Sequence, residues 1–526
     1  MIRIAFLCAL ACPGMSQSDL IPVPNRRGHV YDGSRDILYI STSAGTVERY
    51  DAVQKTLLTP FAVGSSHNGL DITPDEDFIY VTENETVGSL GHLHKVDLET
   101  GAVTTLSYTL SSFETGSWDV AIANNGLGFM STRSSSSGLF PFRELDLATD
   151  TLSIRMDVPG SGPGGGVRQD TQINRGRDRS LLFMTESSTP FGPIFTYDAA
   201  SDSFPVNDTT GAFLNASISS VNGDGTSIAT ELLGVSILDT SLETVANVGN
   251  FTGGLIFDPH RERLYVVDAI DDDVVALDTD GYAELFRLNI GQNATSSSAH
   301  GNGEMSISPD ASKLFLSTGS GVRMFDLGPV LPIALDVQPD RVPFPAPPIQ
   351  VALSGKFFDL ATNTQVFFGD VEATDVQVVD GVTVLATTPA SLPGVVDVRL
   401  TSSAGQTILP DAFAYTPAIQ VSGNLTPGGE ARIEYLVEPG DGLIAIYGLP
   451  PEVAVATPPF AGSLCVAAPF LLFEAPSWFL DVFEIEVPIA ASPSLSGVTI
   501  LLQALVGPDL AGGVGAWSNC AEFEIQ

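Results

Sequence analysis

The sequence is short of basic residues. Only 23 Lys and Arg stand against 62 Asp and Glu, which gives a net charge of −39, and Lys occurs only at Lys55, Lys95, Lys313 and Lys356. A surface of this sign repels phosphate backbones, so nucleic acid and bare anionic membranes are not expected as partners. Divalent cations and an acidic, solvated surface on an exported protein fit the charge.

Other absences narrow the function. The sequence contains no G-x-S-x-G, H-E-x-x-H or C-x-x-C motif and no phosphate-binding glycine loop, which argues against the common hydrolases. No run of about 20 apolar residues follows the N-terminal segment, so no transmembrane segment is expected. Charged residues make up only 16% of the 526 residues, whereas 51 Gly and 35 Pro favour a turn-rich, all-β protein with several folded units.

The N-terminus has the pattern of a signal peptide over residues 1–18. Arg3 precedes an apolar run over residues 4–12, and Pro13, Gly14 and small residues follow. Cleavage after Ser16 or Ser18 would give a secreted, periplasmic or cell-surface protein; lipidation at Cys12 is the alternative. Removal of this segment leaves two cysteines, which in an exported protein are expected to form a disulfide, Cys465 to Cys520.

A turn followed by an apolar strand occurs seven times before residue 330, as in ITPDEDFIYVT from Ile72 and ISPDASKLFLS from Ile307. Equivalent apolar positions recur about every 46 residues, the length of a four-stranded blade, at Tyr39, Tyr80, Phe129, Phe183, Ile228, Tyr265 and Phe315. An aspartate follows each of them at the end of a third strand, at Asp51, Asp97, Asp146, Asp198, Asp239, Asp278 and Asp326. The repeat predicts a seven-bladed β-propeller over residues 19–330.

The segments IYVT, LYVV and LFLS stand where the YVTN-type propeller repeat has its signature, and the resemblance covers roughly residues 28–327. It implies the fold and leaves the activity open, since such propellers include lactonases, cofactor enzymes and surface proteins. The seventh copy has only three strands, so residues 20–24 are expected to close the ring by pairing beside residues 322–325.

Two further β units are predicted after the propeller. Residues 331–416 resemble the IPT/TIG immunoglobulin-like family in the order SGKFF, VFFG, TTPA, GVVDVRL and FAY, which implies a spacer or interaction module. Residues 417–526 alternate apolar and polar residues in ARIEYLVE and LIAIYGL, which predicts a C-terminal β-sandwich. This last part resembles C-terminal β modules of exported bacterial proteins.

Alignment of the innermost strands places three acids, Asp119, Asp170 and Glu304, at one equivalent position, with Asp71 two residues further along its strand. Carboxylates around one channel mouth suggest a metal site, and Ca²⁺ fits hard oxygen donors best. The alternative is that these acids bond to neighbouring blades and water. Candidate ligand-binding residues at the same channel are His67, Asp71, Trp118 and His300.

Extended loops favour the face that carries the entries to the innermost strands. They occupy residues 84–91, 133–141 and 187–193, and long loops on a rigid scaffold are common binding sites. A small molecule, a glycan or a protein is the expected ligand. Two other polar segments are interpreted as structural: residues 268–281 as a solvated hairpin rather than a calcium loop, and His92 with His94 as a strand edge rather than a metal pair.

Two functions remain. The first is a secreted or cell-surface binding or adhesion-type protein with β spacer modules. The second is a lactonase-like propeller hydrolase, because HGNGEMSISPDASKLFLST from His300 resembles the seven-bladed lactonase pattern. That family carries Asn-Arg after the strand, where this sequence has Thr318-Gly319-Ser320-Gly321, so the arginine that would stabilise developing negative charge is missing. The sequence therefore favours binding over catalysis.

Overall fold

The structure is a computed structural model that describes residues 18–136, 138–159, 166–186, 194–205, 207–208, 218–231, 234–345, 347–449, 455–475 and 482–526. Residues 1–17, which hold the expected signal peptide and Cys12, lie outside these ranges, as do the loop at residues 187–193 and Ser137. The expected all-β fold class is confirmed: the only helices in the described ranges are two 3-10 turns, η1 (Phe358–Leu360) and η2 (Pro493–Leu495).

The chain divides into two compact units, one that ends at Pro329 and one that begins at Val330. Each unit is described by itself below. Within the described ranges, no helix has the length and apolar character that a membrane crossing requires.

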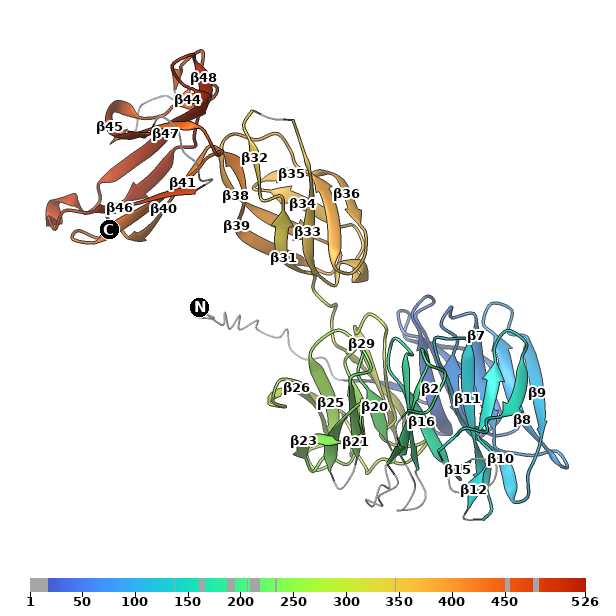
Figure 1. Cartoon of the computed structure of the whole chain (residues 1–526). Helices are drawn as coiled ribbons and strands as arrows, with labels where there is room; N and C mark the ends of the chain where they lie inside the picture. Colours follow the sequence, from blue (N-terminus) through green and yellow to red (C-terminus); the bar gives the residue numbers. More distant parts are fainter. Residues whose placement is uncertain are drawn as a thin grey trace. The chain divides into compact units, whose positions relative to one another are not determined.

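The first unit contains seven four-stranded antiparallel sheets, the blades of a β-propeller (Figure 1). Blade one contains β2 (Arg26–Asp32), β3 (Ile37–Thr42), β4 (Thr46–Asp51) and β5 (Thr56–Ala62). Blade two contains β6 (His67–Ile72), β7 (Phe78–Glu83), β8 (Leu90–Asp97) and β9 (Val103–Thr109). Blade three contains β10 (Glu114–Ile122), β11 (Leu127–Ser134), β13 (Arg143–Asp146) and β14 (Thr151–Ile154). A separate ribbon pairs β12 (Leu139–Phe140) with β15 (Val167–Arg168).

Blades four to seven complete the ring. They consist of β16 (Thr171–Arg175), β17 (Leu181–Glu186), β18 (Ile194–Asp198) and β19 (Asn207–Asp208); β20 (Ser219–Val221), β21 (Ser227–Glu231), β22 (Val235–Asp239) and β23 (Thr244–Gly249); β24 (Leu255–Phe257), β25 (Arg263–Asp268), β26 (Asp273–Asp278) and β27 (Glu284–Asn289); and β28 (Met305–Ile307), β29 (Lys313–Thr318), β30 (Gly321–Asp326) and β1 (Asp19–Ile21). The first strands of adjacent blades contact each other around the ring, so β2, β6, β10, β16, β20, β24 and β28 surround a central channel.

The N-terminal strand closes the last blade. Strand β1 lies antiparallel to β30, with Asp19 opposite Met324 and Ile21 opposite Val322. The expected closure is confirmed for Leu20 and Ile21, although pairing begins one residue earlier than predicted and stops before Pro22, which has no N–H to donate.

The core of the propeller lies between blades. The seven repeated apolar positions are all buried, with at most 1% of each residue exposed. Each joins a hydrophobic cluster that extends into a neighbouring blade, as Tyr39 does with Ile72 and Ile79. Six of the seven repeated aspartates accept turn N–H groups as expected; the Asp97 carboxylate, for example, accepts hydrogen bonds from the backbone N–H groups of Glu99 and Thr100. The exception is Asp278, whose Oδ1 is buried without a hydrogen-bond partner among the described residues.

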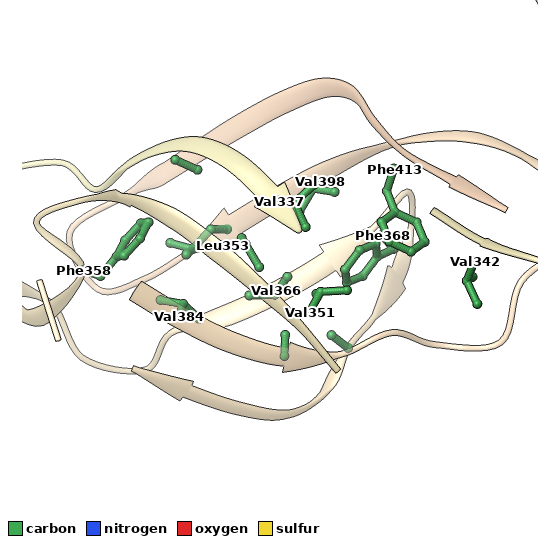
Figure 2. Packing of buried hydrophobic residues seen from close by; sticks show 14 of the residues in the cluster. Val337, Val342, Val351, Leu353, Phe358, Val366, Phe368, Val384, Val398 and Phe413 are labelled. Atoms are coloured by element: carbon green, nitrogen blue, oxygen red, sulfur yellow. The ribbon is translucent and has the colours of Figure 1, made fainter. Parts of the chain in front are cut away.

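The second unit begins with two facing sheets. One contains β31 (Ile333–Gln338), β33 (Gln350–Lys356), β37 (Thr383–Thr387) and β36 (Thr374–Val378); the other contains β32 (Arg341–Pro343), β39 (Gln406–Thr416), β38 (Gly394–Thr401), β34 (Gln365–Phe368) and β35 (Val371–Glu372). Buried residues of both sheets form one core, in which the rings of Phe368 and Phe413 lie 4.8 Å apart, centroid to centroid (Figure 2). This is the sandwich arrangement expected from alternating strands.

The remaining strands form two more sheets and a short ribbon. One sheet contains β40 (Ala418–Asn424), β41 (Glu430–Leu436) and β46 (Val482–Pro488); the other contains β45 (Ala467–Ala475), β42 (Gly442–Leu449), β47 (Thr499–Asp509), β48 (Val514–Trp517) and β49 (Ala521–Glu524); the ribbon contains β43 (Val455–Ala456) and β44 (Ser463–Leu464). A second core that includes Ile419, Tyr435 and Leu502 joins the two sheets.

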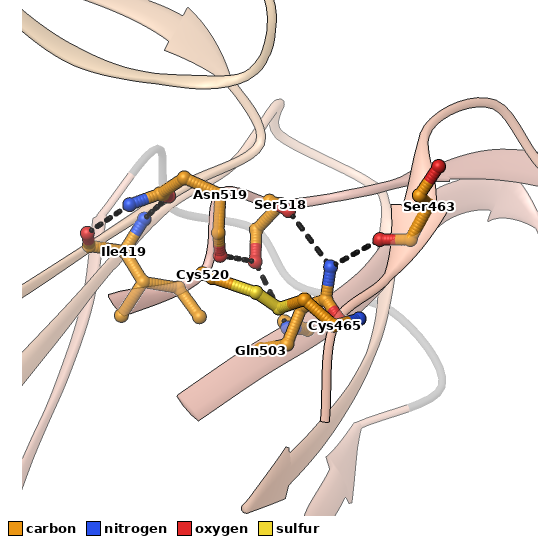
Figure 3. Close-up of a disulfide and its surroundings, with 8 residues drawn as sticks. Ile419, Ser463, Cys465, Gln503, Ser518, Asn519 and Cys520 are labelled. Atoms are coloured by element: carbon orange, nitrogen blue, oxygen red, sulfur yellow. Dashed lines mark hydrogen bonds between the residues drawn. A yellow bond between two sulfur atoms is a disulfide. The ribbon is translucent and has the colours of Figure 1, made fainter. Parts of the chain in front are cut away.

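A disulfide joins Cys465 to Cys520, with 6.2 Å between the two Cα atoms (Figure 3). Beside it, the buried Gln503 side chain accepts a hydrogen bond from the Cys465 N–H and donates to the carbonyl oxygens of Ser463 and Ser518. The bridge and the glutamine thus fix the segment around Cys465 against strand β47.

Replacing both cysteines by Ser is expected to destabilise the second unit alone. The bridge spans 55 residues of sequence, for which chain entropy gives a stabilisation of about 4 kcal/mol as an upper value. Urea denaturation of the full chain, followed by hydrogen exchange of each unit, measures the loss. An unchanged unfolding midpoint in the double variant, or an equal loss in both units, would contradict this expectation.

Candidate functional site

A cavity of about 390 Å³ occupies the central channel of the propeller. Asp119, His300 and Glu304 line one end of the cavity. Turn residues on the opposite face of the propeller line the other end: Pro74, Gly223, Pro259 and Pro309. Among the predicted site residues, Asp71, Asp119, His300 and Glu304 line this cavity, whereas His67, Trp118 and Asp170 do not. The sequence therefore identified four side chains that the fold brings to one space.

The acids on the innermost strands share one structural role. Each accepts a backbone N–H from the first strand of the next blade: Asp71 from Ile122, Asp119 from Ile173, and Glu304 from His29. These three bonds link consecutive blades at the channel wall. These three contacts agree with the second interpretation given above, in which the acids are hydrogen-bonded to neighbouring blades.

Asp71 is fully engaged in such contacts. Besides Ile122, its carboxylate accepts hydrogen bonds from the guanidinium groups of Arg175 and Arg179, at 2.8–3.2 Å, and from the N–H of Ile72. Burial raises the pKa of Asp71, but the two arginines outweigh burial and the net pKa is lowered. Asp71 is thus a buried, charged support of the wall.

Asp119 and Glu304 differ because no arginine of the described residues forms an ion pair with either of them. Burial is the main cause that raises the pKa of Asp119 to about 7. Burial, followed by repulsion from Asp119, raises the pKa of Glu304 to about 8. At pH 7 Glu304 is therefore mostly protonated and Asp119 is protonated about half of the time, so both can donate as well as accept hydrogen bonds.

His300 lies between these two carboxyl groups. Its Nε2 is 3.9 Å from Asp119 Oδ1 and its Nδ1 is 3.9 Å from Glu304 Oε2, both too far for a hydrogen bond. Both ring nitrogens and Glu304 Oε2 are buried and have no hydrogen-bond partner among the described residues. Burial, with a further contribution from Arg27, lowers the pKa of His300 to about 3, so the ring is neutral.

The other predicted residues take different positions. Trp118 is buried against His300, with 4.9 Å between ring centroids. His67 is buried beside Glu83 and His94, and its Nδ1 donates to the carbonyl oxygen of Thr82. Asp170 precedes β16 and its N–H donates to the carbonyl oxygen of Thr132. Within the described ranges, no group of three or more His, Cys, Asp or Glu is arranged to hold a metal ion.

Residues 268–281 and the pair His92 and His94, which the sequence indicates are structural, form ion pairs and hydrogen bonds within the propeller. Residues 268–281 include the turn between β25 and β26, where Asp268 and Asp271 form ion pairs with Arg287. His94 is more buried than a strand edge would be: its ring bonds to Glu83 and Thr105. His92 bonds to Ser107 on the neighbouring strand.

Three further candidate binding residues were not identified from the sequence: Arg26, Arg27 and Arg133. Arg26 and Arg27 begin β2, and Arg133 lies near the end of β11, so all three occupy the face of the extended loops. Asn84, in the first of those loops, accepts a hydrogen bond from Arg133 at 2.7 Å. The Arg-Arg pair in a chain so poor in bases was the available signal.

Comparison with known proteins leaves the chain without an assigned family. No family model matches the sequence, and no curated protein matches it. Among solved structures, one similar chain is titled "Kuenenia stuttgartiensis Hydrazine Synthase", with a TM-score of 0.45 and 15% identity, covering 60% of this chain and 98% of that chain. A likeness at this level carries no argument about function, and the propeller assignment rests on the strand pairings.

Proposed function

We propose that this protein is an exported ligand-binding protein whose propeller holds a small polar molecule in its central cavity. One observation supports this function. At the end of the cavity that Asp119, His300 and Glu304 line, His300 Nδ1 and Nε2 and Glu304 Oε2 are buried without hydrogen-bond partners among the described residues. Leaving such groups unsatisfied costs about 1–3 kcal/mol each. A bound molecule with hydroxyl or carbonyl groups would satisfy them.

The proposal places the other parts of the chain in supporting roles. The YVTN-type propeller is the binding unit, and the IPT/TIG-like sandwich and the C-terminal sandwich are spacer or interaction modules. Export at residues 1–18, to the periplasm, the cell surface or the medium, fits the disulfide between Cys465 and Cys520.

Ligand binding is tested on the purified full chain with a defined panel of monosaccharides, hydroxy acids, amino acids, lactones and Ca²⁺. Thermal unfolding screens the panel and titration calorimetry measures any ligand that stabilises the chain. Replacement of His300 by Gln is expected to weaken binding at least tenfold, because one buried polar contact contributes about 1.4 kcal/mol or more. The matched control is His92→Gln, since the ring of the partly exposed His92 bonds to Ser107 on a neighbouring strand, away from the cavity.

Several outcomes of this panel are decisive. If no compound stabilises the chain, or if His300→Gln and His92→Gln respond alike, the proposed cavity function is wrong. If lactones are consumed rather than merely bound, the hydrolase alternative applies, with Glu304 as the proton donor beside His300. If only Ca²⁺ stabilises the chain, and Asp119→Asn with Asp170→Asn abolishes the effect, the site is the calcium site predicted from the sequence.

A further inference from the structure

Three arginines at the loop face have no carboxylate partner in the described part of the chain. Arg26 bonds to Asn302 and Pro24, Arg27 to the His300 carbonyl oxygen, and Arg133 to Asn84. Of the twelve other described arginines of the propeller, seven form ion pairs: Arg35, Arg143, Arg155, Arg175, Arg179, Arg261 and Arg287. The other five form no ion pair among the described residues: Arg49, Arg168, Arg177, Arg263 and Arg323. In a chain with 62 Asp and Glu, an acidic partner would be easy to supply.

Arg27 and Arg133 both lie close to the pair formed by His300 and Trp118. Arg27 Nη1 lies 3.5 Å from the carbonyl oxygen of His300, and the His300 ring lies against Trp118. The guanidinium carbon of Arg133 lies 6.0 Å from the Trp118 ring centroid. Burial, and then the charge of Arg133, lower the pKa of Arg27, which shows that the two cations are close enough to repel each other.

The same place holds three buried donor atoms for which the described residues offer no acceptor. Arg26 Nε, Arg27 Nε and Trp118 Nε1 are buried and have no hydrogen-bond partner among the described residues. Arg26 and Trp118 are each only 9% exposed. All three atoms can donate and none can accept, so the missing group is an acceptor.

The nearest carboxyl group does not fill this role. Glu304 lies close enough for Arg26 and Arg27 to lower its pKa, but burial and Asp119 raise it by more. Its Oε1 accepts the N–H of His29, and no arginine donates to it. A neutral Glu304 leaves the positive charge of the arginines uncompensated.

We propose that a small oxyanion, a carboxylate or a phosphate or sulfate group, binds between Arg27 and Arg133 beside Trp118 on the loop face of the propeller. Guanidinium groups offer paired N–H donors that match the two oxygens of such a group. This site lies apart from the central cavity, because neither arginine nor Trp118 lines that cavity. His300 belongs to both sites: it lines the cavity, and its carbonyl oxygen accepts a hydrogen bond from Arg27.

The test uses sodium acetate, sulfate and phosphate as probes, with sodium chloride at matched ionic strength as the reference. At least one oxyanion is expected to raise the melting temperature of the full chain along a saturable curve, and calorimetry gives its Kd. Arg27→Gln and Arg133→Gln are each expected to weaken that binding at least tenfold. Arg49→Gln is the matched control: among the described residues Arg49 also has no carboxylate partner, and its Nε is also buried without a hydrogen-bond partner. It stacks on Phe61, 4.5 Å from the ring centroid, in an outer part of blade one.

Stability in chloride separates a lost site from a lost fold. Removing one of two mutually repelling cations is expected to leave the melting temperature of Arg133→Gln equal to or above that of the unmodified chain. The proposal is overturned if no oxyanion binds saturably, or if Arg27→Gln, Arg133→Gln and Arg49→Gln bind the probes alike. Neither result alters the cavity test, because its readout is the response of His300→Gln to the ligand panel.

Discussion

Replacement of Asp71 by Ala is expected to destabilise the propeller by about 3–5 kcal/mol, the usual cost of breaking a buried ion pair from one side. The substitution leaves Arg175 and Arg179 without their shared carboxylate. It also leaves the N–H of Ile122, on the next blade, without an acceptor. Urea denaturation of the full chain, with hydrogen exchange to assign each transition, measures the effect.

The matched control for this substitution is Asp97→Ala. Asp97 also accepts two backbone N–H groups, but it does so in an exposed turn without a cation. Its loss is therefore expected to cost much less stability than the loss of Asp71, because water can replace an exposed acceptor. Equal losses in the two variants would show that the arginine pair at Asp71 contributes nothing, and transitions that change in the second unit would contradict the assignment to the propeller.

Stability of the propeller is expected to fall by about 2–3 kcal/mol between pH 6.5 and pH 8. The pKa of Asp119 is raised from 3.8 to about 7 and that of Glu304 from 4.5 to about 8, mainly by burial. The folded state therefore holds these protons more tightly than the unfolded state does. Their contribution is full below about pH 4 and is lost as the pH rises through 7 and 8.

Three buried histidines act in the opposite direction at lower pH. Burial lowers the pKa of His29 from 6.5 to about 4 and that of His300 from 6.5 to about 3, and it lowers the pKa of His67 as well. Their contribution is complete above about pH 6.5 and decreases as the pH falls below it. They oppose the carboxyl groups between pH 4.5 and 6.5, so the fall in stability is expected to begin only above about pH 6.5.

Chemical denaturation at intervals from pH 5 to 9 measures this profile. Glu304→Gln, which is neutral at every pH, is expected to remove more than half of the fall above pH 6.5. Asp97→Asn provides a control variant at an exposed position. A profile that keeps its full slope in Glu304→Gln would contradict the raised pKa of this carboxyl group.

The propeller could be predicted from the sequence because its code is local and repeated. Tyr39, Tyr80 and the five equivalent residues recur at one spacing, and each is buried between blades. The turn aspartates, such as Asp97, bond to N–H groups only two or three residues away. Features of this range depend on the residues of one blade, so every copy provides independent evidence for the same structure.

The site could be predicted only in part, because its contacts join different blades. Aligning the strands placed Asp119 and Glu304 at equivalent positions, yet no alignment tells which atoms of a neighbouring blade they bond to. Arg27, Arg133 and His300 come from blades one and three and from the segment before β28. Their proximity depends on ring closure, and nothing in the local sequence of any one of them indicates the other two.

The part of the extended loops that the structure describes is more ordered than the sequence suggested. Residues 139–140, in the second loop, form β12 and pair with β15. Each partner contributes only two residues to this ribbon, and a two-residue strand has too little sequence pattern to predict.

Ring closure by β1 has a consequence for the order in which the protein is made. Asp19 emerges during synthesis about 300 residues before its partner Met324. Throughout that interval the edge of blade seven does not exist, and β1 remains an unpaired strand. Two chains at high concentration offer each other the same edge, so exchange of β1 between copies competes with closure of one ring. A tag or deletion at residue 19 would therefore alter blade seven, at the opposite end of the propeller sequence.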